Sequence, residues 1–187
     1  MQQEFSALIG EAGAIAEDAG RTFGALDRDQ LNWKPAESQW SVAQCFDHLI
    51  KINSTYFPQL ERIEQGSYSP TWRDRVPWAA RLFGSLVLNA VKPESPRKYK
   101  AARFVDASPS AIDEGIIARF MAHQQEVVEH MKRTGGRDVN AIILKSPVAP
   151  VVFYSLLDAF RIIVAHERRH MAQAERVVKS EGFPSAR

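Results

Sequence analysis

Apolar residues recur at intervals of three and four along four long segments, and polar residues fill the positions between them. This spacing is typical of helices that bury one face. The four segments are residues 3–23, 42–65, 109–133 and 154–181. No strand-pairing pattern competes with them. The sequence therefore predicts an all-α fold, a four-helix bundle.

Local signals mark where two of these helices begin. Ser41 and Gln44 fit a capping box, in which the Ser41 hydroxyl accepts a hydrogen bond from the Gln44 amide and the Gln44 side chain reaches back. Ser108 and Pro109 are a favourable N-cap and first-turn pair for the third helix. Residues 26–39, just before the capping box, are expected to be a polar connector.

The connector between the second and third long helices contains an apolar stretch at residues 78–91, which predicts an extra short helix. Apolar side chains occupy most of the circumference of this predicted helix. One side of it is therefore expected to meet something other than the main core. This apolar pattern is compatible with three arrangements: a lid over a metal site, a subunit interface, or a small helix buried by its own loops. The basic segment 92–103 is typical of a solvated loop, with a phosphate site as the less favoured alternative. The apolar runs within residues 137–153 are short and bounded by proline, so this segment is not expected to form a sheet.

Length and composition predict one domain over residues 1–187, since 45% hydrophobic content suffices for one well-buried core. The 24 basic and 22 acidic residues give a net charge of +2, which is too balanced for a nucleic-acid partner. A single cysteine, Cys45, suits a reducing cytoplasm. The chain shows neither a signal peptide pattern nor an apolar run of about 20 residues. We therefore expect a cytoplasmic protein with no membrane partner.

Two histidines, His166 and His170, lie on the apolar stripe of the last helix. Residues four apart face the same side of a helix, so both imidazoles can reach one divalent metal ion at about 2.0 to 2.1 Å. A site needs at least a third ligand. His48, at the margin of the apolar stripe of the second helix, is the candidate. Three neutral imidazoles would leave a coordination position open, which distinguishes catalytic from structural sites.

The other candidate residues have less specific roles. Glu167 is offset by about 100° from His166 around the helix, so it can orient a ligand, act as a catalytic base, or be solvated or salt-bridged, the interpretation we favour. Cys45 is expected to pack as a small apolar group. His123 and His130 are about 10 Å apart along their helix, too far to share one ion, and are expected to be ordinary histidines.

Residues 166–170 also match His-Glu-x-x-His, the fingerprint of zinc proteases. One extended form of that motif requires glycine and a third histidine where this chain has Gln173 and Arg176. Another form requires a carboxylate on a further helix, yet only 17 residues follow His170. No strand edge is predicted that could hold an extended peptide. A protease is therefore disfavoured.

Trp40 and Ser41 followed by His48, together with His166 and His170 on the last helix, resemble the DinB/YfiT-like superfamily of metal-binding four-helix bundles. The resemblance covers nearly the whole chain, including the order of the helices and the spacing of the motifs. It implies that His48, His166 and His170 are the three metal ligands.

The resemblance further implies a metal-dependent enzyme that acts on a small molecule. The reaction would be thiol transfer, with a low-molecular-weight thiol as one substrate, or hydrolysis. A metal-binding bundle without catalysis, such as a stress or interaction protein, is the alternative. Histidine-only ligation suits Zn or Ni, and Fe or Mn also fit. Family habit and the apolar 78–91 segment suggest a homodimer.

Overall fold

The computed structural model describes residues 2–69, 71–72, 76–93, 106–109, 111–149 and 151–185. It is predominantly helical, with a two-stranded antiparallel sheet. The elements, in chain order, are α1 (Gln2–Phe23), α2 (Arg28–Asn32), α3 (Val42–Ser54), α4 (Phe57–Glu64), α5 (Pro77–Val91), α6 (Ile116–Thr134), β1 (Ile143–Lys145), β2 (Phe153–Ser155) and α7 (Leu156–Val178).

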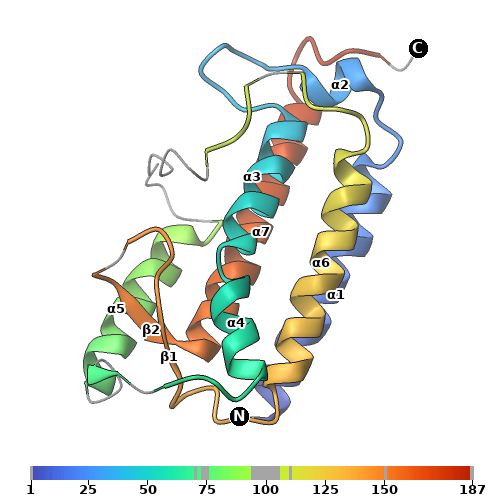
Figure 1. Ribbon diagram of the computed structural model, residues 1–187. Helices are drawn as coiled ribbons and strands as arrows, with labels where there is room; N and C mark the ends of the chain where they lie inside the picture. Colours follow the sequence, from blue (N-terminus) through green and yellow to red (C-terminus); the bar gives the residue numbers. More distant parts are fainter. Residues whose placement is uncertain are drawn as a thin grey trace.

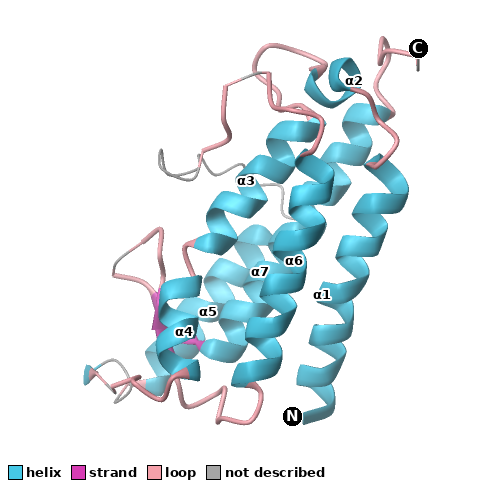
Figure 2. Ribbon diagram, turned by 45° about the vertical axis from the view of Figure 1, so that its right-hand side comes forward, coloured by secondary structure: helices cyan, strands magenta, loops and turns pink. Residues whose placement is uncertain are grey.

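The long helices form the predicted all-α bundle. Helix α1 packs along α6, while α3 packs along both α6 and α7, with α4 continuing the direction of α3 (Figures 1 and 2). Apolar side chains from every one of these helices fill the space between them. Fully buried examples are Ile15, Phe23, Phe46, Leu49, Leu60, Phe120 and Phe160. Each such side chain stabilises the fold by about 1.5 to 3 kcal/mol relative to an exposed position, so the shared core holds the bundle together.

The capping box predicted at the start of α3 is present. Ser41 Oγ accepts a hydrogen bond from the Gln44 amide at 3.2 Å, and Gln44 Oε1 accepts one from the Ser41 amide at 3.1 Å. The Gln44 side chain also donates to the carbonyl of Ser108 at 2.8 Å, which ties the segment before α6 to α3. The start of α3 therefore stands at a fixed place in the bundle.

The second predicted helix is not continuous over residues 42–65. It ends at Ser54, and α4 begins at Phe57 with Pro58 in its first turn. Proline has no amide hydrogen to donate to the carbonyl four residues earlier, so the helix breaks there. Pro58 is a helix-breaking signal in the sequence. The prediction of one continuous helix relied instead on the apolar spacing, which continues without interruption.

The third long helix begins at Ile116, not at Pro109 as the sequence predicts. The amides of Ala111 and Ile112 both donate to Asn32 Oδ1, at 3.2 and 2.9 Å. The Ser108 amide donates to Asp47 Oδ2 at 2.7 Å. These contacts with distant residues satisfy the backbone in a non-helical form, so they override the local helix-start signal.

The prediction of no sheet is wrong. Strands β1 and β2 pair antiparallel, with Leu144 opposite Tyr154. The Tyr68 hydroxyl bridges the amide and carbonyl of Ile143, and the Gln59 side chain does the same for Lys145. Side chains from outside the hairpin thus satisfy the outer edge of β1. A strand of three residues is too short to show an alternating hydrophobic pattern, and contacts with distant side chains cannot be recognised in its sequence.

The polar connector at residues 26–39 contains a helix that the sequence analysis missed. Asp27 caps α2 with a capping box, because its side chain accepts from the Gln30 amide while Gln30 Oε1 accepts from the Asp27 amide. This is the same motif that marks α3. It was overlooked because few apolar residues follow it.

Helix α5 is the predicted extra helix, and it lies on the flank of the bundle beside the hairpin (Figure 1). It approaches α7 closely at Gly84, where a Cβ atom would lie 2.7 Å from Asp158 Oδ2. Its side chains Trp78, Leu82 and Leu86 are exposed, so one side of α5 lies outside the main core, and what that side meets stays a prediction. The basic segment 92–103 lies outside the described residues beyond Pro93. None of the described helices is both long and apolar enough to span a bilayer.

Candidate metal centre

The structure brings the three predicted ligands together. His48 is in the second turn of α3, and His166 and His170 lie one turn apart on α7. One nitrogen of each ring lies within 4.8 Å of the others. The Nε2 atoms of His166 and His170 are 3.1 Å apart. Metal–nitrogen bonds of about 2.0 to 2.1 Å in a tetrahedral site place ligand nitrogens about 3.3 Å apart, so this cluster can hold a metal ion.

Burial favours the neutral, metal-binding form of His166 and His170. His48 and His170 are buried, and His166 is half-buried. Burial, followed by the nearby His48 ring and the charge of Arg169, lowers the pKa of His166 to about 3. Burial and the neighbouring imidazoles also lower the pKa of His170 well below its ordinary value. Neutral imidazole is the ligating form, so these rings need lose no proton to bind a metal ion at neutral pH.

Trp40 forms an aromatic wall against two of these imidazoles. Its ring is nearly parallel to that of His170, with an interplanar angle of 20° and centroids 5.4 Å apart, and its centroid lies 5.0 Å from that of His48. Because Trp40 directly precedes the N-cap Ser41, the capping box that starts α3 also positions this wall. The contacts hold both rings in a fixed orientation.

Among the described residues, no aspartate, glutamate or cysteine joins the three histidines as a further potential ligand. Cys45 is fully buried in the core, and burial raises the pKa of its thiol to about 12. It packs as a small apolar group, as the sequence predicts. Among the described residues the donor set is therefore three imidazole nitrogens, a set that would leave a coordination position open on a bound metal ion.

Glu167 is not solvated, contrary to the favoured interpretation of the sequence. Its side chain is fully buried in the bundle, where it accepts hydrogen bonds from Asn53 Nδ2 at 2.7 Å and Gln124 Nε2 at 2.9 Å. The same Gln124 nitrogen donates to the carbonyl of Ala12 at 3.1 Å. Burial raises the pKa of Glu167 to about 8, although the two amides oppose the shift. Glu167 thus links α7 to α3 and α6, and its catalytic role stays a prediction.

Sequence reasoning missed three residues of this region. Asn53 and Gln124 are polar residues at buried positions of otherwise apolar helix faces, and that mismatch is the signal that could have identified them. Arg169 lies three residues after His166, so it is near the ligand face of α7. Its helical spacing from the histidine pair was an available signal as well.

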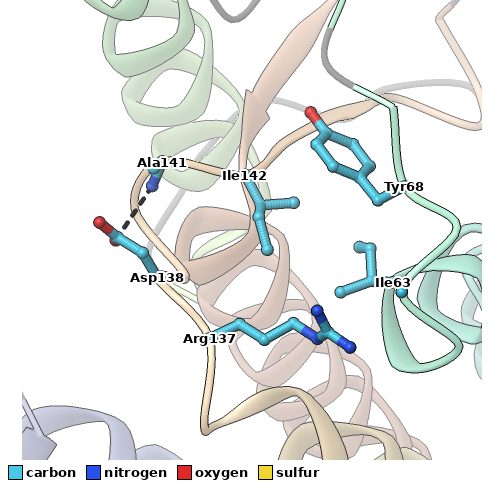
Figure 3. A pocket seen from close by; sticks show the side chains of 7 residues that line it. Ile63, Tyr68, Arg137, Asp138, Ala141 and Ile142 are labelled. Carbon is cyan, nitrogen blue, oxygen red and sulfur yellow. Dashed lines mark hydrogen bonds between the residues drawn. The ribbon is translucent and has the colours of Figure 1, made fainter.

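A pocket of about 350 Å³ lies apart from the histidines, where the chain leaves α4 and α6 (Figure 3). Its apolar walls include Ile63, Tyr68 and Ile142. The Asp138 carboxylate turns away from the others to accept a hydrogen bond from the Ala141 amide at 3.2 Å. Arg137 donates to the carbonyl of Glu64 at 3.0 Å. The pocket therefore gathers no set of reactive groups comparable to the three histidines.

His123 and His130 do not take part in the metal cluster. They lie on the face of α6 that meets α4, where the Phe57 ring stacks on His123 and contacts His130, with centroids 5.0 and 4.5 Å apart. His130 Nδ1 lies 2.5 Å from Glu64 Oε1. His123 Nε2 is buried and has no hydrogen-bond partner among the described residues. The prediction of an ordinary hydrogen-bonded or surface histidine holds for His130, whereas His123 is buried in the bundle without a partner for Nε2 among the described residues.

Replacing His123 by leucine is expected to make stability less sensitive to acid. Burial lowers the pKa of His123, with Glu126 opposing the shift and His130 adding to it. Below about pH 6.5 the unfolded chain gains a proton that the folded protein resists, so this histidine makes the folded state less stable as pH falls. Between pH 7 and pH 5 the free energy of unfolding should fall by about 1 kcal/mol more in the wild type than in His123→Leu. Urea unfolding at the two pH values measures this difference. Equal losses would contradict this assignment.

Comparison with known proteins gives one match. The model of the DinB superfamily matches residues 16–174. No curated protein and no solved structure matches the chain. The matched range contains all three histidines of the cluster, the last part of α1, the whole of α3 and α6, and most of α7.

Proposed function

The chain belongs to the DinB superfamily, and from that premise we propose that it is a metal-dependent enzyme acting on a small molecule. The reaction is transfer of a low-molecular-weight thiol to an electrophile, or hydrolysis. His48, His166 and His170 are the proposed metal ligands, and Zn or Ni is the proposed metal. The observation that carries the proposal is the convergence of these three imidazoles, of which one nitrogen each lies within 4.8 Å of the others.

The residues around the cluster support this chemistry. A bound divalent metal would lower the pKa of a coordinated water or thiol and polarise an electrophile. The three imidazoles hold such a centre without supplying charge, and Trp40 keeps two of them in place. Glu167, with its raised pKa and two amide partners, braces the helix that carries His166 and His170.

A metal-binding bundle without catalysis is the alternative, and a fourth protein ligand would favour it. Among the described residues no fourth His, Cys, Asp or Glu joins the cluster, which supports the enzyme instead. The proposed partners are a small-molecule substrate and, through the exposed side of α5, a second copy of the chain. The near balance of charge supports the absence of a nucleic-acid partner.

Metal content per chain tests the proposal. Protein purified without chelator or affinity tag should contain about one divalent metal ion by elemental analysis, and His48→Ala and His166→Ala should contain essentially none. His123→Ala, which removes a histidine outside the cluster, is the matched control and should retain the metal. Unchanged metal content in His48→Ala would refute the three-histidine site.

A screen of thiols against small electrophiles then separates the enzyme from the non-catalytic alternative. The wild type should accelerate one such reaction or a hydrolysis, and His166→Ala should not. Full metal occupancy with no activity on any substrate class would favour the non-catalytic bundle.

A further inference from the structure

A buried polar network crosses the bundle close to the three histidines. Glu167 Oε1 accepts a hydrogen bond from Asn53 Nδ2 on α3 at 2.7 Å, and Glu167 Oε2 accepts one from Gln124 Nε2 on α6 at 2.9 Å. Gln124 Nε2 also donates to the carbonyl of Ala12 on α1 at 3.1 Å. All three side chains are buried. One carboxylate on α7 is therefore connected, directly or through Gln124, to each of the other three long helices.

The hydrogen bond between Asn53 and Glu167 joins the same two helices that carry the proposed ligands. Asn53 is five residues after His48 on α3, about 7.5 Å further along the helix axis. Glu167 is adjacent to His166 on α7. Helix α3 packs along α7 over this stretch (Figure 1). Because each helix is rigid over one or two turns, a shift of α3 along α7 would separate Asn53 from Glu167 and His48 from His166 together.

This hydrogen bond fixes the register of the two helices more sharply than apolar contacts do. Apolar burial is not directional, whereas a hydrogen bond of 2.7 Å tolerates a shift of only about 0.5 Å before it weakens. Breaking it would leave a buried oxygen of Glu167 without its donor. A single buried asparagine sets the register of helices in coiled coils for the same reason. A metal centre needs this precision, because its ligand nitrogens must lie about 2.0 to 2.1 Å from one ion.

We propose that Asn53 is a positioning residue of the metal centre. Its hydrogen bond to Glu167 sets the register of α3 against α7, and this register places His48 beside the two histidines of α7. The inference rests on the proposed metal site and deepens it by identifying the contact that holds ligands from two helices ready for one ion. Asn53 acts through α3, the helix that carries His48, rather than by contact with the ion.

The second arm of the network provides a matched control. Gln124 donates to the other oxygen of the same carboxylate, but α6 carries no proposed ligand. Gln124 and Asn53 are both buried amides, and each also has a side-chain oxygen without a hydrogen-bond partner among the described residues. Asn53→Leu and Gln124→Leu each remove one buried donor from Glu167. Both should lower stability, but only Asn53→Leu should disturb the metal centre.

The dissociation constant for Zn²⁺, measured on the full chain by competition with a chromogenic chelator, tests this role. Asn53→Leu should bind Zn²⁺ about tenfold more weakly than the wild type, whereas Gln124→Leu should match the wild type. Glu167→Gln, which keeps an acceptor for Asn53, should retain most of the affinity. The visible absorption of bound Co²⁺ depends on the arrangement of its ligands and should change in Asn53→Leu alone. Urea unfolding of the metal-free variants measures their losses of stability for comparison.

The outcomes separate this inference from the metal site on which it rests. Equal Zn²⁺ affinity in Asn53→Leu and the wild type would overturn the role of Asn53. Equal losses of affinity in Asn53→Leu and Gln124→Leu would also overturn it, because they would indicate a general effect of lower stability. If the wild type bound neither Zn²⁺ nor Co²⁺, the proposed metal site itself would fail. Asn53→Ser, whose side chain is too short to reach Glu167, gives the same comparison if Asn53→Leu does not fold.

Discussion

Replacing Glu167 by alanine is expected to lower the free energy of unfolding by about 2 to 4 kcal/mol, a large share of the stability of a domain of this size. The substitution removes a fully buried side chain from the centre of the bundle. It leaves Asn53 Nδ2 without its 2.7 Å acceptor, and Gln124 keeps only its bond to the Ala12 carbonyl. A buried donor that loses its acceptor costs about 1 to 3 kcal/mol, and the cavity adds to that cost.

Glu167→Gln is the matched control for the alanine variant. Glutamine keeps the shape and one acceptor oxygen, and its amide can donate to the oxygens of Asn53 or Gln124, both buried without a partner among the described residues. We therefore expect Glu167→Gln to stay within about 1 kcal/mol of the wild type in urea unfolding at pH 7. If both variants lost equal stability, the carboxylate rather than the amide network would be the important feature.

Saturating Zn²⁺ or Ni²⁺ is expected to stabilise the wild type by about 4 kcal/mol when the free metal is a thousandfold above its dissociation constant. The proposed ligands come from α3 and α7, and the unfolded chain would not hold them together. Binding therefore favours the folded state, and the melting temperature should rise by roughly 10 °C. Scanning calorimetry with metal, and again after chelation, measures the difference.

His48→Ala and His123→Ala give the contrast that identifies the site. The first should lose nearly all of the metal-dependent stabilisation, while the second should keep it. A similar rise in melting temperature for His48→Ala would place the bound metal elsewhere on the protein.

The sequence was informative wherever the signal was local. The Ser41–Gln44 capping box appears as predicted because its partners are three residues apart. The start of α6 was predicted wrongly because Asn32, far away in the chain, binds the amides of Ala111 and Ile112. Local propensity loses such a competition when distant side chains satisfy the backbone first.

The same distinction applies to the candidate site. Periodicity alone determined the all-α bundle and put His166 and His170 on one side of one helix, because rise and rotation per residue are fixed by backbone geometry. Tertiary structure decided how near His48 comes to that pair, since the register between α3 and α7 depends on how their side chains pack. It also decided that Glu167 is buried between amides and that Arg169 rests on the end of α5. Burial and neighbouring charge, which set the chemistry of these groups, are properties of the packed bundle and not of any single helix.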